Sequence, residues 1–134
     1  MLSPALTALR LSLHVLSAAI WVGGQLTLAG LVPSLRAAAT GAPASAAAAF
    51  GRMAWPAFAV LVGTGIWNVI AVGPAGQGSA WRSVLWAKLA VVALSGISAF
   101  LHGRSSSRRG LAAWGAVSGL SATAALVLGV VLSG

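Results

Sequence analysis

An arginine, a histidine and a glutamine interrupt the apolar stretch from Leu9 to Leu26, namely Arg10, His14 and Gln25. On an α-helix, which turns by about 100° per residue, these three and Trp21 fall within about 60° of one another. One face of the first apolar segment therefore carries all three of these groups. An imidazole on such a face can bind a metal through a ring nitrogen, or it can serve packing by hydrogen bonding to a carbonyl oxygen of a neighbouring helix.

A second set of polar residues recurs at every seventh position later in the chain: Trp81, Lys88, Ser95 and His102. This heptad spacing predicts that the four share one face of a helix. The sequence contains no Asp or Glu that could pair with the Lys88 ammonium inside a membrane. Three states are open for this amine: it extends to the interface, it is uncharged, or it binds an acidic ligand or a metal. We assign His102 to the membrane interface.

His14 and Lys88 are predicted to lie at the same depth, because each is about 12 Å below the start of its helix and the two helices run in the same direction. If both polar faces turn inward, the imidazole and the amine border one cavity. Both groups can donate a lone pair to haem iron, so these two residues are the candidate metal ligands.

Five further residues could contact the same cofactor. Arg10 and Arg82 lie one to two turns closer to the outer surface, where haem propionates would emerge, and Asn68 is at the level of Arg10. Trp21 and Trp86 could border a porphyrin or serve packing alone. The predicted cofactor site is therefore an imidazole and an amine inside, with basic and amide groups nearer the outer surface.

The elements that position these residues are predicted to be transmembrane helices. The chain has 134 residues, of which 59% are hydrophobic, and a formal net charge of +8, a composition foreign to soluble domains. Apolar stretches of about 20 residues predict an all-α integral membrane four-helix bundle that forms one domain over residues 1–134. The predicted spans are residues 4–32, 53–72, 80–101 and 111–132. We expect residues 36–52, interrupted by Gly41 and Pro43, to form a loop that contains short helical turns at most.

The distribution of arginines predicts the orientation of the chain. Two loops, between spans one and two and between spans three and four, hold Arg36, Arg52, Arg104, Arg108 and Arg109. The opposite side holds only Arg10 and Arg82, so the positive-inside rule places both loops in the cytoplasm and both termini outside. The tryptophans expected at the inner interface are Trp55 and Trp114, and those expected at the outer interface are Trp67 and Trp81. The sequence thus predicts a multi-pass protein of a bacterial-type plasma (inner) membrane, with the lipid bilayer as its surroundings.

Three motifs in order, LHVLSAAIWVGGQL, GTGIWNV and WRSVLWAKLAVVAL, resemble the CopD (copper-resistance D) family across most of the chain. The arrangement of a histidine in the first helix and a lysine in the third is also similar to HemJ, a haem-containing protoporphyrinogen oxidase. In that family a histidine and a lysine at corresponding places form the essential pair and the expected haem ligands. The resemblance therefore implies that His14 and Lys88 ligate haem, while the W-V-G-G sequence is the CopD form.

Three functions follow as hypotheses. The first is a haem b-binding membrane protein that acts in electron transfer or in an oxidation at the membrane, and whether it is an enzyme stays open. The second is a copper-binding or copper-transporting protein, although only Met1 and Met53 could supply thioether ligands. The third is a small accessory subunit of a larger membrane complex, and Gly115 and Gly119 could equally serve a homodimer. Nucleic acid is not expected as a partner, because no basic run is interleaved with aromatic residues.

Overall fold

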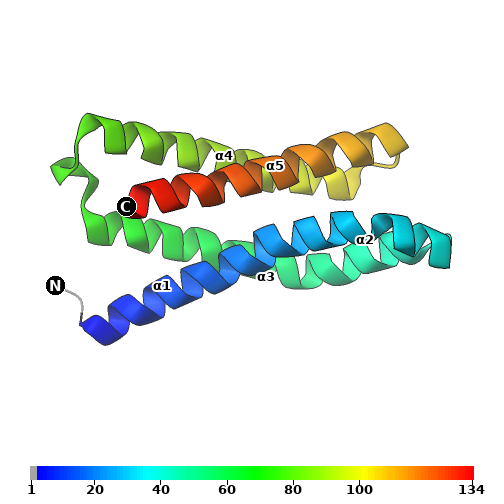
Figure 1. The fold of residues 1–134 in the computed structure, drawn as a ribbon, viewed down its shortest axis with the longest axis horizontal. Helices are drawn as coiled ribbons and strands as arrows, with labels where there is room; N and C mark the ends of the chain where they lie inside the picture. The colour runs from blue at the N-terminus through cyan, green and yellow to red at the C-terminus, as the bar shows by residue number, and fades with distance from the viewer. Residues whose placement is uncertain (1–2) are drawn as a thin grey trace. The chain divides into compact units, whose positions relative to one another are not determined.

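The computed structural model describes residues 3–134, which are helical or form short connections and include no strand. The helices are α1 (Pro4–Ala18), α2 (Gly24–Ala38), α3 (Ala42–Val72), α4 (Ser79–Arg104) and α5 (Arg108–Ser133). A five-residue π-helical turn, Ala19–Gly23, joins α1 to α2 without a break, so these form one long helix. The chain divides into two compact units at Gly73. We call α1 to α3 the first hairpin and α4 with α5 the second hairpin, and describe each by itself (Figure 1).

The first long helix begins with a side-chain cap and continues past the proline that we expected to end it. The Ser3 hydroxyl accepts a hydrogen bond from the Leu6 amide at 3.3 Å, and Pro4 occupies the first turn, where its missing N–H costs nothing. The predicted end at residue 32 is wrong, because the helix passes through Pro33 and ends at Ala38. Proline removes one helical hydrogen bond, and the Leu, Arg and Ala residues that follow it favour the helix enough to continue it.

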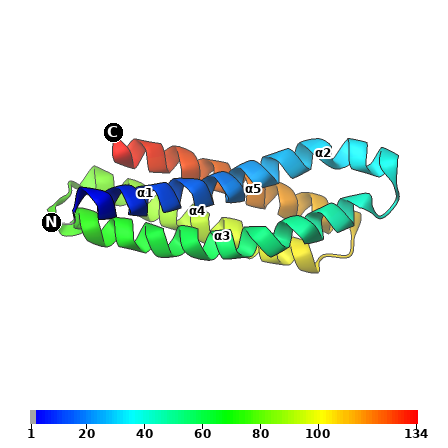
Figure 2. The ribbon, with the colours of Figure 1, turned by 90° about the horizontal axis from the view of Figure 1, so that it is seen from below.

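The connection between α2 and α3 is much shorter than predicted. Ala39 is extended, with φ −163° and ψ 150°, and α3 already begins at Ala42. Pro43 lies in the first turn of α3, so it starts the helix that we expected it to interrupt. Alanine has the highest helix propensity of any residue, and the sequence that follows is rich in it, which explains why residues 42–52 extend α3. Figures 1 and 2 both show α2 lying alongside the first part of α3.

The helix ends around the second hairpin follow local rules. Gly73 ends α3 in the left-handed conformation, with φ 68°, which glycine adopts without a Cβ penalty. One 3-10 turn, Pro74–Gly76, leads to α4. At the other end of the second hairpin, the Ser107 hydroxyl accepts a hydrogen bond from the Gly110 amide at 3.0 Å and caps α5.

Within residues 3–134, four helices are long and apolar enough to cross a membrane: residues 4–38, 42–72, 79–104 and 108–133. Most of their large apolar side chains are exposed, for example Val15, Ile70 and Leu120. Such continuous apolar surface is foreign to soluble monomers and suits helices that face lipid. The buried residues between the helices are mainly small, as in helix packing within membranes.

The second hairpin is closed by a seam of serines, which we define as Ser95, Ser98, Ser118 and Ser121. All four are buried, and Ser98 is 0% exposed. Ser95 Oγ donates to the Ser118 carbonyl and Ser118 Oγ donates to the Ser95 carbonyl, both at 3.1 Å. This reciprocal pair joins the two backbones directly, because the small side chains allow the helices to approach closely.

Candidate functional site

The contact between α1 and α3 in the first hairpin contains two matched polar pairs. Arg10 Nη1 donates to Asn68 Oδ1, and His14 Nδ1 lies 2.9 Å from Thr64 Oγ1. We call these four residues the polar ladder. Arg10 and His14 are four positions apart on α1, and Thr64 and Asn68 are four positions apart on α3. Because residues four apart occupy one helix face, two antiparallel helices bring the pairs into register, one turn after the other.

Arg10 is buried, with 7% of its surface exposed. Asn68 accepts one hydrogen bond from the guanidinium but carries no charge. The Nε atom of Arg10 is also buried and has no hydrogen-bond partner within residues 3–134. The sequence has no Asp or Glu whose carboxylate could neutralise the Arg10 guanidinium. A buried guanidinium whose donors are only partly used is costly in the protein interior.

The hydrogen bonds of Thr64 fix the orientation of the His14 ring. Thr64 Oγ1 has backbone acceptors in its own helix, the Val60 carbonyl at 2.7 Å and the Leu61 carbonyl at 3.1 Å. Its one proton is therefore directed to the backbone, and Oγ1 accepts from the Nδ1–H of His14. The neutral ring in this tautomer carries its lone pair on Nε2. Metal-binding histidines use the same arrangement, in which one nitrogen donates to the protein and the other ligates.

Gly65 lies beside the His14 ring. A Cβ at position 65 would be 3.5 Å from His14 Cε1, which is ordinary contact, so the absence of a longer side chain leaves room for the ring. Thr64 and Gly65 were not among the predicted site residues, although both lie in the motif GTGIWNV. Their spacing from Asn68 was a usable signal, because a residue that pairs with Arg10 places the residue one turn earlier opposite His14.

Trp21 belongs to an aromatic cluster of the first hairpin. It is 3% exposed, and its ring lies 5.5 Å from Trp55 and 4.3 Å from Phe58, between ring centroids. The cluster packs against Trp21 and contributes to its burial within the first hairpin. It also shows Trp55 well inside α3, beside the π-helical turn, whereas the sequence placed Trp55 at the start of its span.

The π-helical turn changes the predicted polar face beyond Trp21. A π turn is wider than an α turn, so the residues after it are rotated relative to a uniform helix. Gln25 Nε2 donates to the carbonyl of Trp21 at 3.1 Å, within its own helix. Arg10 and His14 thus face α3 together, while the amide of Gln25 serves the backbone around the turn.

The heptad stripe of α4 faces α5. Trp81 Nε1 donates to the Leu132 carbonyl at 3.3 Å, and Ser95 bonds to Ser118 within the serine seam. Lys88 Nζ lies over Gly129, at 2.8 Å from the point where a Cβ would be. His102 Nδ1 donates to the Leu111 carbonyl at 2.8 Å, and its ring lies over Gly115. The shared face was predicted from the spacing, and its neighbour within the hairpin is α5. The meeting of Lys88 with His14 stays a prediction.

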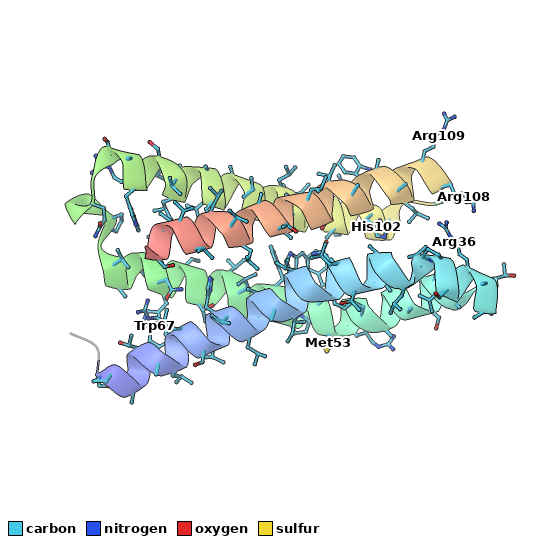
Figure 3. All side chains as sticks on the ribbon, in the orientation of Figure 1. Arg36, Met53, Trp67, His102, Arg108 and Arg109 are labelled. Carbon is cyan, nitrogen blue, oxygen red and sulfur yellow. The ribbon has the colours of Figure 1, made fainter. Side chains whose placement is uncertain are left out.

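Arg82 and Trp86 have surroundings unlike those of Arg10 and Trp21. The Arg82 side chain is exposed, and its Nη1 donates to the Gln77 carbonyl at 2.9 Å, in the turn before α4. Trp86 is 69% exposed on α4. Three of the arginines assigned to the predicted cytoplasmic loops are exposed too. Arg36 projects from the last turn of α2, and Arg108 and Arg109 project from the first turn of α5 (Figure 3).

The donor set of the chain limits which metal group fits. No three His, Cys, Asp or Glu side chains come together in the described part of the chain, residues 3–134. The sequence has two histidines and no cysteine or acid. A bare metal ion usually takes three or four such protein ligands, whereas haem needs only one or two axial ligands. The oriented His14 and the partly used Arg10 donors suit a group that brings its own equatorial ligands and negative charge. Comparisons of the chain with family models, curated proteins and solved structures found no match.

Proposed function

We propose that this chain is a multi-pass membrane protein that binds haem b through His14 and takes part in electron transfer or another redox reaction at the membrane. The observation that carries the proposal is the hydrogen bond from His14 Nδ1 to Thr64 Oγ1. It orients an imidazole within an apolar helix through one ring nitrogen, the arrangement that metal-binding histidines use.

Haem fits the donor set better than copper does. Iron in haem receives four ligands from the porphyrin, so one histidine is enough to hold it. Copper would need further ligands from outside the pair His14 and Lys88, since the chain has no cysteine, Asp or Glu, and His102 lies fourteen residues, about 21 Å, from Lys88 along α4. When bound, haem supplies a one-electron redox couple. The chain's own part is to hold His14 in one tautomer and to surround it with apolar helices.

The resemblance to the CopD family and to HemJ supports the same proposal and adds Lys88 as the second axial ligand. In the second hairpin, Gly129 leaves the space in which the Lys88 amine lies. The arginine distribution further supports an inner-membrane protein with both termini outside. Small residues along the helices allow other helices to approach closely in lipid, so the chain could form a homodimer or join a larger membrane complex.

The test is a visible absorption spectrum with metal analysis of the purified chain, expressed with a haem precursor. We expect a Soret band and about one iron per chain, and we expect His14→Ala to abolish both. The matched control is His102→Ala, which removes the other histidine and should leave the band unchanged. Colourless wild-type protein, or copper in place of iron, would refute the haem proposal.

Two further variants test the parts of the proposal. Thr64→Val keeps the shape but removes the acceptor of His14, and we expect haem affinity to fall by about 10- to 100-fold. Thr123→Val is its control, because Thr123 bonds only to the Gly119 carbonyl of its own helix. Lys88→Met should shift the spectrum if the amine ligates iron, and an unchanged spectrum would leave His14 as the only ligand from this pair.

A further inference from the structure

Three arginines, Arg10, Arg36 and Arg82, carry the same charge but differ in burial and in hydrogen-bond partners. Arg36 and Arg82 are exposed, and Arg82 donates to a loop carbonyl. Arg10 is 7% exposed, and its Nε donates to no acceptor within the described residues. Exposed arginines at helix ends are satisfied by water and lipid headgroups, but a buried one needs a partner of its own.

The side chain that holds Arg10 is suited to share a ligand with it. Asn68 accepts from Arg10 Nη1 through Oδ1, so its amide nitrogen, on the other side of the amide group, carries two N–H donors that this hydrogen bond does not use. Guanidinium and amide donors side by side are the groups that bind carboxylate or phosphate oxygens. Since no residue of the chain is acidic, a negative partner must come from another molecule.

The position of the pair in the first hairpin limits what kind of molecule carries the anion. Arg10 lies in the second turn of α1 and Asn68 in the last turns of α3, so the pair is close to one end of the hairpin. His14 is one turn further along the same face. An anionic group at the end of a membrane-embedded ligand can reach Arg10 while the rest of that ligand lies among apolar side chains.

We propose that Arg10 and Asn68 form an oxyanion subsite that binds a carboxylate or phosphate carried by a ligand embedded in the membrane. Two sources share this chemistry: a propionate of the haem, which rests on the proposed function above, and the phosphate of an anionic phospholipid, which does not. In this subsite Asn68 holds the Arg10 guanidinium and adds its own amide donors. The oxyanion accepts a hydrogen bond from the buried Arg10 Nε–H and neutralises the charge of the guanidinium.

The first arm of the test compares haem with haem dimethyl ester, in which both propionates are blocked. Wild-type protein should bind free haem more tightly than the ester by on the order of tenfold or more, the effect of a charge-assisted hydrogen bond. Arg10→Gln should reduce this ratio to about one. Asn68→Asp should do the same, because the new carboxylate pairs with Arg10 in the oxyanion's place. Arg36→Gln removes an equal charge at an exposed site of the same hairpin and should keep the ratio.

The second arm uses haem-free protein in mild detergent with added phosphatidylglycerol or phosphatidylcholine. If phosphate is the source, phosphatidylglycerol should raise the thermal unfolding temperature of wild type and of Arg36→Gln above that seen with phosphatidylcholine, and this difference should vanish in Arg10→Gln and Asn68→Asp. Binding of this kind without any haem binding would support the subsite and refute the proposed function. If both variants behave as wild type in both arms, the subsite is refuted, even where His14→Ala still shows that haem is bound.

Discussion

The two hairpins place polar side chains inside apolar helices in opposite ways. In the second hairpin the serines bond to backbone carbonyls, within their own helix or across to the next. Those carbonyls belong to regular helices, so these serines serve a closely packed helix interface. In the first hairpin, side chain meets side chain: Arg10 with Asn68 and His14 with Thr64. Polarity in the second hairpin joins helices, whereas polarity in the first orients groups that can bind a ligand.

The largest effect that separates the hairpins is expected at their buried and exposed tryptophans. Trp21→Ala removes the centre of the aromatic cluster formed with Trp55 and Phe58, and should lower the free energy of unfolding by about 3 to 5 kcal/mol. Trp86→Ala, on an exposed side chain, should change it by about 0.5 kcal/mol or less. Unfolding in mild detergent measures both. Equal losses would mean that Trp86 is covered by a partner and that this contrast is wrong.

Close packing in the serine seam predicts the next effect. Ser98 is fully buried between α4 and α5, so Ser98→Leu forces the helices apart and should cost up to about 3 kcal/mol. The control is Ser106→Leu in the exposed turn between the same helices. Detergent unfolding again measures the difference. A tolerated Ser98→Leu would show that α5 does not approach α4 as closely as the seam requires.

The polar pairs themselves can be compared directly. Thr64→Val removes the Thr64 acceptor of His14 Nδ1, a buried donor, and should destabilise the haem-free chain by about 1 to 3 kcal/mol. Ser118→Ala removes a donor but leaves the Ser95 carbonyl its helical bond, so the loss should be only about 0.6 kcal/mol. If Ser118→Ala costs as much as Thr64→Val, the two hairpins use polarity alike.

The smallest effect concerns the glycine under Lys88. Alanine favours a helix over glycine by about 1 kcal/mol, so Gly119→Ala, which meets open space, should stabilise α5. Gly129→Ala should stabilise it less, by roughly 0.5 kcal/mol, because the new methyl displaces the Lys88 amine. Thermal unfolding of the two variants side by side provides the measurement. Equal stabilisation would place the Lys88 side chain elsewhere.

The number of long apolar helices was predictable because hydropathy in lipid is a strong signal, and the shared face of Lys88 and His102 followed from heptad spacing. Two features of the first hairpin were not predictable in this way. We expected Pro33 to end a helix and Pro43 to interrupt one. Pro33 lies inside a helix, where neighbouring alanines and leucines outweigh one lost hydrogen bond, and Pro43 lies in the first turn of α3, where no helical hydrogen bond is lost. The π-helical turn, which contains Trp21 of the aromatic cluster, was not predicted from the sequence either.

Of the residues that meet in the first hairpin, the sequence named Arg10 and His14 of α1 and Asn68 of α3, but not Thr64 and Gly65. Arg10 and His14 are visible as polar residues in an apolar run, whereas Thr64 and Gly65 look like ordinary members of a helix until their neighbours are known. The pairing of helix faces depends on packing over the whole hairpin, and helix periodicity in one sequence does not reveal that pairing. For the same reason the predicted approach of Lys88 to His14 depends on information that helix periodicity does not contain.

The unequal lengths of the helices have a practical consequence. The first long helix has 35 residues and α4 has 26, so at about 1.5 Å per residue the former extends roughly 13 Å further. The turn that follows its far end, at Thr40, should stand clear of the headgroups on whichever side the arginine-rich loops face. The chain has no native thiol, so a cysteine introduced there would be the sole target of an impermeant maleimide. Labelling only after vesicles are opened or inverted would establish the orientation of the whole chain in one reaction.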